Sequence, residues 1–206
     1  MEKFRIAVFL ILCTNLVLLA QNTGISFTSQ HLSENQDLSD ILFFEGIDFY
    51  KLQFTGQELT GKTFKLTAKE MWDGNLRKET LITDSSQIDV KGLETIKDSI
   101  FRMKIISKAI DDKLRMSFKF PRYGRDIEFD AIQTRDYSLR NIAETFKEEF
   151  EIGKPFFVLA YILPYEKDGA KYWCAVESSG KDIENWGKKF GIKHYIIFEM
   201  CFGCNQ

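Results

Sequence analysis

The sequence reads KLRMSFKF at residues 113–120, PRYG at 121–124 and RDIEFDAI at 125–132, and this stretch decides the fold class. Apolar and polar residues alternate through most of both outer runs, which is the period of a β-strand with one buried face. The four residues between the runs begin with proline and end with glycine, which favour a turn. The stretch therefore predicts an antiparallel hairpin with one dry face and one wet face.

A particular register is expected for this hairpin, in which Phe120 faces Arg125. Apolar residues then meet across the buried face, and opposite charges meet across the outer face, as a half-buried antiparallel pair requires. The expected pairs are Phe118 with Ile127, Met116 with Phe129, Leu114 with Ala131, Lys119 with Asp126, and Arg115 with Asp130. A slip of one residue would exchange the two faces and lose every match.

Further strands are expected on both sides of the hairpin. Residues 101–110 lead into it through Asp111-Asp112, which makes a three-stranded meander. The turn Asp73-Gly74-Asn75 joins two more strand-like runs. Residues 156–163 form a continuous apolar run, which is typical of a strand buried on both faces. The remaining predicted strands are 47–54, 63–72, 76–83, 171–177 and 194–202.

Two helices are expected in the last third of the chain. Apolar residues between 139 and 150 fall on one helical face, with Ser138 as a cap. A shorter helix would carry Ile183, Trp186 and Phe190, with a capping-box start at Ser179 and a stop at Gly191. The predicted fold class is α+β: mainly an antiparallel β sheet or sandwich, with two helices in the C-terminal third.

The N-terminus predicts export. Residues 1–20 combine a basic start, an apolar run from Ile6 to Leu19 and a small residue, Ala20, which together are typical of a signal peptide. The apolar run is too short to favour a retained membrane anchor, and Cys13 fits a lipoprotein signal poorly. We expect residues 21–40 to be a loosely ordered lead-in and residues 41–206 to be a single globular domain, periplasmic or secreted, with no membrane span.

Composition excludes few classes of function. The chain has 28 Lys and Arg against 30 Asp and Glu, so it lacks the basic footprint of a nucleic-acid-binding protein. No phosphate-binding loop and no zinc-like spacing occurs, so we expect no cofactor and no metal. Asp126, Glu128 and Asp130 point the same way from one strand and could hold Ca²⁺, but the predicted register already places cations opposite two of them.

Three cysteines follow the signal peptide, and all are disulfide candidates: Cys174, Cys201 and Cys204. The last two have the C-x-x-C spacing of a redox motif. Redox-active pairs lie at a helix N-terminus, which lowers a thiol pKa, whereas this pair ends a predicted strand. The position of the pair therefore favours a structural or incidental role.

Catalytic candidates are few. His194 opens a strand and is better placed than His31, which lies in the lead-in. Ser178 and Ser179 precede it but lack the frame of a nucleophile elbow. A carboxylate pair for glycoside cleavage could be drawn from Glu70, Asp73, Glu166, Asp168, Glu177 or Glu199, but 30 acidic residues always allow such a choice. We assign no catalytic residue.

Three aromatic residues are the candidate binding residues: Trp72, Tyr123 and Tyr165, each at a predicted loop tip. Exposed rings can stack on sugars or fill a pocket on a partner. The competing interpretation is that these rings fold back over the ends of the sheet.

Three segments also carry a resemblance: GKTF to WDG (61–74), YILPYEKDG (161–169) and CAVESSG (174–180). With them, the chain resembles an uncharacterised secreted family of gut Bacteroidales across nearly the whole mature protein. The resemblance implies a periplasmic or surface setting, and it implies no activity and no functional residues.

Two functional hypotheses follow. The favoured one is a binding or structural module of the cell envelope, whose partner would be a glycan or an envelope protein. The alternative is an envelope hydrolase acting on glycans or peptides through His194 or a carboxylate pair. A cleft shared by aromatic rings and carboxylates would favour the enzyme, and scattered sites would favour the module.

Overall fold

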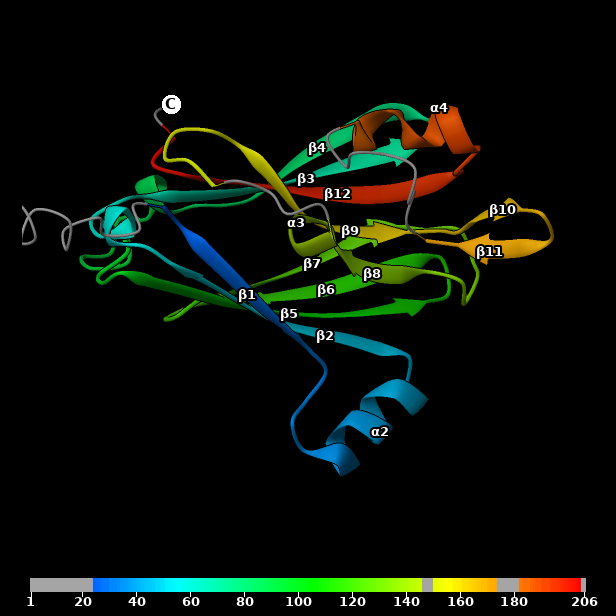
Figure 1. Ribbon diagram of the computed structural model, residues 1–206, viewed down its shortest axis with the longest axis horizontal. Helices are drawn as coiled ribbons and strands as arrows, with labels where there is room; N and C mark the ends of the chain where they lie inside the picture. Colours follow the sequence, from blue (N-terminus) through cyan, green and yellow to red (C-terminus); the bar gives the residue numbers. More distant parts are fainter. Residues whose placement is uncertain (1–23, 146–149, 174–181, 205–206) are drawn as a thin grey trace, which may run out of the picture.

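Two antiparallel sheets packed face to face form the body of the molecule (Figure 1). The computed structural model describes residues 24–145, 150–173 and 182–204. Each sheet has five strands, and a separate two-stranded hairpin extends from one end of the sandwich. The predicted class, an α+β protein built mainly of antiparallel β sheet, is confirmed.

The first sheet has the strand order β1-β2-β5-β6-β7. Its strands are β1 (Ser26–His31), β2 (Ile47–Thr55), β5 (Ile100–Ile110), β6 (Lys113–Lys119) and β7 (Gly124–Asp130). Buried and exposed residues alternate along β5 and β6, so the predicted meander is confirmed.

The second sheet has the strand order β4-β3-β12-β9-β8. Its strands are β3 (Phe64–Trp72), β4 (Asn75–Asp84), β8 (Ser138–Asn141), β9 (Phe156–Ile162) and β12 (His194–Phe202). The last strand of the chain thus lies at the centre of the sheet, between β3 and β9. Nearly every residue of β9 and β12 is buried, and the continuous apolar run at 156–163 predicted this for β9.

Aromatic side chains fill the space between the two sheets. Phe54 of the first sheet lies 5.1 Å, between ring centroids, from Phe202 of the second. Phe118 and Phe198 meet across the same interface at 5.5 Å. All four side chains are fully buried, and burial of such rings stabilises a fold by about 1.5–3 kcal/mol each.

The register of the β6–β7 hairpin differs from the prediction by two residues. Met116 pairs with Ile127 and Leu114 with Phe129, and on the outer face Arg115 pairs with Glu128 instead of Asp130. The buried and exposed faces are as predicted, because a shift of two preserves the alternation. The N–H of Phe120 donates to the carbonyl of Tyr123 at 2.8 Å, so the turn is tighter than the four-residue loop expected.

The β3–β4 hairpin closes on the predicted turn. Asp73 and Gly74 both have positive φ, 47° and 74°, as a two-residue hairpin turn requires. The turn also touches the helical segment η4 (Ile183–Asn185) and α4 (Trp186–Phe190), because a Cβ on Gly187 would lie 2.4 Å from Cα of Gly74. The predicted stop at Gly191 is present, with φ 70°, whereas Ser179 lies outside the described residues.

The other predicted helix begins later than expected, and residues 146–149 lie outside the described residues. Residues 138–141 form β8 and pair with β9, so Ser138 is not a cap. Helix α3 (Ile142–Thr145) begins after them, with the side chain of Asn141 accepting a hydrogen bond from the N–H of Glu144 at 3.1 Å. Pairing with the free edge of β9 outweighs the helical spacing of Leu139 and Ile142.

The segment expected to be a loose lead-in contains regular structure from Ser26 onward. It forms β1 and then begins α2 (Gln36–Phe44), whose N-terminus is capped by Asn35 through a 3.0 Å bond from the N–H of Leu38. In Figure 1, α2 stands away from both sheets. Asn35 followed by Asp37 is a helix-start signal that the sequence interpretation overlooked.

The remaining elements are short: η2 (Gln57–Leu59), η3 (Ser85–Gln87), β10 (Tyr165–Lys167) and β11 (Ala170–Tyr172). The strand predicted over 171–177 is described only to Trp173. Within the described ranges, no helix combines the length and the apolar character needed to cross a membrane.

Candidate binding cleft

Two of the predicted aromatic residues, Tyr123 and Trp72, lie at opposite ends of the sandwich. Tyr123 packs on Phe120, which in turn contacts Phe64 at the start of β3. Trp72 ends the same strand, and a nine-residue strand spans about 26 Å. Tyr165 stacks on Phe190 of α4, with ring centroids 5.0 Å apart. Each of the three rings is only partly exposed. The competing interpretation, in which the rings fold back over the ends of the sheet, therefore accounts for much of their packing.

Trp72 is held by its neighbours at the far end of the sandwich. Its ring lies 4.1 Å from that of His194, between centroids, and the guanidinium of Arg77 lies 5.2 Å from the ring. His194 is fully buried, and its Nδ1 lies 2.5 Å from the hydroxyl of Tyr137. Burial lowers the pKa of His194 to about 4, so the imidazole is neutral at pH 7.

The candidate catalytic side chains at this end of the sandwich, His194 and Glu70, are buried. Three clefts lie beside Tyr123, at residues 86–91 and beside α2, and none of them is lined by His194, Trp72 or Glu70. Burial raises the pKa of Glu70, whose Oε1 lies 3.8 Å from Nζ of Lys78. Ser178 and Ser179, the candidate nucleophiles, lie outside the described residues.

The acidic row on β7 is occupied by salt bridges. Asp126 contacts Lys119 at 3.2 Å, Glu128 contacts Arg115 at 3.9 Å, and Asp130 contacts Lys113 at 2.6 Å. The hydrogen bond from Ser117, then that from Lys119, lowers the pKa of Asp126. Among the described residues, no cluster of three or more His, Cys, Asp or Glu side chains has the arrangement of a metal site.

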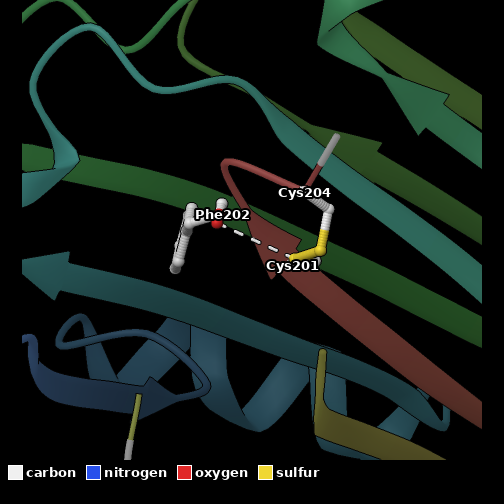
Figure 2. Close-up of a disulfide and its surroundings, with 3 residues drawn as sticks. All are labelled: Cys201, Phe202 and Cys204. Atoms are coloured by element: carbon white, nitrogen blue, oxygen red, sulfur yellow. Dashed lines mark hydrogen bonds between the residues drawn. A yellow bond between two sulfur atoms is a disulfide. The ribbon is translucent and has the colours of Figure 1, made fainter. Parts of the chain in front are cut away.

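Cys201 and Cys204 form a disulfide at the end of β12 (Figure 2). Cys201 is buried in β12, one residue before the strand ends, and Gly203 between the two cysteines has a positive φ of 65°, which lets the chain turn back. The bridge lies at the end of a strand rather than in a helix, in keeping with a structural role. Cys174 lies outside the described residues.

One cleft is lined by a predicted binding residue, Tyr123. It has a volume of about 400 Å³, within the range of small-ligand sites. Only Lys104 and later residues of β5 pair with β6, so residues 100–103 extend past the hairpin and form one wall. The loop 92–98 and the turn 119–123 form the other sides.

The floor of this cleft is apolar and its rim is basic. Phe64, Phe101, Met103 and Phe120 are buried core residues that reach the cleft, and Tyr123 lies half-buried beside them. The hydroxyl of Tyr123 is hydrogen-bonded to Thr83 at 2.8 Å, which orients the ring. The charged lining residues are five cations, Lys97, Arg102, Lys104, Lys119 and Arg122, and one anion, Asp98.

The sequence interpretation identified only Tyr123 among these residues. Alternation along β5 places Arg102 and Lys104 on one face, and this alternation could be recognised in the sequence. Their approach to Lys97 and Arg122 was not readable, because it depends on how the loop 92–98 crosses the end of the sheet.

Two other clefts differ in character. A shallow one of about 430 Å³ is formed by residues 86–91 and Glu94. A wider groove of about 970 Å³ runs beside α2 and includes Phe43 and Phe44, which are 80% and 86% exposed. Two neighbouring aromatic rings exposed to this extent are unusual on a protein surface.

Comparison of the chain with models of protein families, with curated proteins and with solved structures found no match. The function must therefore be argued from the site itself.

Proposed function

We propose that this protein is an exported, non-catalytic binding module of the cell envelope, and that its ligand occupies the cleft beside Tyr123. The observation that carries the proposal is the cleft itself, in which an apolar floor is surrounded by convergent polar groups. This combination is typical of ligand sites. A glycan is the ligand class we favour.

The setting rests on two independent features. Residues 1–20 have the composition of a signal peptide. The Cys201–Cys204 disulfide supports an oxidising compartment, since such bonds are rare in the cytosol. The resemblance to a secreted family of gut Bacteroidales agrees with both.

Binding is favoured over hydrolysis because the cleft holds a single carboxylate. Glycoside hydrolysis generally uses two carboxyl groups roughly 5–9.5 Å apart across the scissile bond. Asp98 is the one acidic residue of the lining, and its Oδ1 accepts a hydrogen bond from the N–H of Ile100 at 2.7 Å. A second acidic residue is missing from this lining.

A cleft-filling variant tests the proposal. Thr95→Trp places a large ring in the cleft, and Leu81→Trp places the same ring at an exposed position of β4 outside it. Thermal-shift screening of a library of neutral, anionic and cationic saccharides should find a ligand that raises Tm for the wild type and for Leu81→Trp, but not for Thr95→Trp. Ligands that stabilise all three proteins equally would place the site elsewhere. Release of cleavage products from a bound saccharide would contradict a non-catalytic function.

A further inference from the structure

Two pairs of positively charged side chains face the cleft beside Tyr123, and they indicate that its ligand carries negative charge. The whole chain has slightly more acidic than basic residues, 30 against 28, whereas the cleft lining has five cations and one anion. A local excess of this kind opposes folding through repulsion, and it attracts anions.

The first pair is Lys97 and Arg122, which meet at Gly92. A Cβ on Gly92 would lie 3.0 Å from Nη1 of Arg122 and 3.7 Å from Nζ of Lys97, so the two nitrogens lie within about 7 Å of each other. Arg122 donates one hydrogen bond to the carbonyl of Gly92 at 2.9 Å, which holds the guanidinium across the cleft. Its other N–H groups are available to an acceptor in the cleft.

The second pair is Lys104 and Lys119, which lie directly opposite each other on β5 and β6. Like charges in this position destabilise a sheet. Asp126 forms a salt bridge with Lys119 at 3.2 Å, whereas Lys104 makes no salt bridge within the described residues. Lys104 therefore carries a charge that no described carboxylate pairs with, whereas Lys97 interacts electrostatically with Glu94 beside Gly92.

The apolar floor adds a second requirement. A free inorganic anion would leave the half-buried ring of Tyr123 uncovered. A sugar ring has an apolar C–H face that can cover aromatic rings while acidic substituents at its edge reach the cations.

We infer that the ligand is an acidic saccharide, whose carboxylate or sulfate groups pair with Lys97, Lys104 and Arg122 while a ring lies on the floor beside Tyr123. This inference rests on the proposed function and specifies its ligand. Charge-assisted bonds from a guanidinium and two ammonium groups would supply the selectivity for acidic over neutral sugars.

Isothermal titration calorimetry tests the inference with three probes: trigalacturonate, the neutral cellotriose, and sodium sulfate. Trigalacturonate should bind the mature chain and bind more weakly at higher salt, since exposed charges are screened. Lys97→Gln combined with Lys104→Gln should weaken it about tenfold or more. The matched control, Lys65→Gln with Lys193→Gln, removes two exposed lysines outside the cleft and should change nothing.

Each contrary outcome has a distinct meaning. If cellotriose binds as well as trigalacturonate and the Lys97/Lys104 variant binds both normally, the acidic class is wrong and the binding cleft stands. If sulfate alone competes at the same concentration as trigalacturonate, the ring contributes nothing and the saccharide is wrong. Failure of all three probes also overturns the inference, while the library screen with Thr95→Trp still decides the proposed function. Equal binding of trigalacturonate to Thr95→Trp overturns both.

Discussion

The hydroxyl of Tyr137 bonds to Nδ1 of His194, and the other ring nitrogen of His194 has no hydrogen-bond partner within the described residues. The imidazole lies in the sandwich interior beneath Trp72. A second proton would place an uncompensated charge there, which is why burial lowers the pKa of His194 so far.

The free energy of unfolding should therefore depend on pH through His194 in mildly acidic solution. The pKa of His194 is about 4 in the folded protein and 6.5 in a model peptide, so between these values the unfolded chain binds the extra proton. The free energy of unfolding should fall by roughly 3 kcal/mol as pH drops from 6.5 to 4. Denaturant melts of wild type and His194→Asn across this range measure the effect. The Asn variant should lose most of this dependence, and Tyr137→Phe, which keeps the imidazole, should retain it. Parallel pH profiles for wild type and His194→Asn would assign the effect to other groups.

The β6–β7 register predicts unequal costs for two neighbouring substitutions. Met116 is fully buried opposite Ile127, so Met116→Asp should destabilise the protein by about 4 kcal/mol or more, because it buries an unpaired charge. Arg115 is exposed and lies 3.9 Å from Glu128, so Arg115→Ala should cost less than about 1 kcal/mol. Urea melts of both variants check this. Similar losses would mean that Met116 does not face the core.

The contact between Gly74 and Gly187 leaves no room for a methyl group. Gly187→Ala should destabilise by about 1–3 kcal/mol, since its Cβ would lie 2.4 Å from Cα of Gly74 and force α4 away from the turn. Gly24→Ala is the matched control, because no atom lies within 4 Å of a Cβ there. Thermal unfolding of the two variants separates a packing cost from the general effect of replacing glycine. Equal Tm values would contradict the close approach.

The disulfide closes a very short loop, so its contribution to stability should be limited. Loop-closure entropy for a four-residue ring gives about 2 kcal/mol. Cys204→Ser should lower the free energy of unfolding by no more than about this amount while the sandwich stays folded, as circular dichroism would show. Loss of the folded state would assign the bridge a larger role than strand closure.

Processing of the N-terminus can be tested directly. Intact-mass analysis of the exported protein should give a chain that begins at Gln21, because Ala20 ends the apolar run and a polar segment follows. A mature protein that retains Cys13 with an attached lipid would contradict cleavage at this position.

Part of the candidate site could be anticipated from the sequence. Tyr123 stood out because proline and glycine flank its turn, and local turn chemistry is visible in a single sequence. Lys97 and Arg122 could not be paired, because 24 residues separate them and their approach depends on Gly92, whose φ is 91°. Trp72 and Tyr165 looked similar to Tyr123 in sequence, and packing against His194 and Phe190 distinguishes them.

The sequence by itself determined which residues are buried along the main strands. Alternation in β5 and β6, the continuous apolar runs of β9 and β12, and the Asp73-Gly74 turn are local patterns, and a strand's faces follow from its two-residue period. Only the tertiary structure decided which residues face each other. A two-residue shift of β7 keeps its faces, so the tight turn at Phe120 and Tyr123 had to select the register, and the free edge of β9 turned a helical pattern into β8. Periodicity specifies a face, whereas partners far apart in the chain are chosen by packing and by hydrogen bonds across the finished sheets.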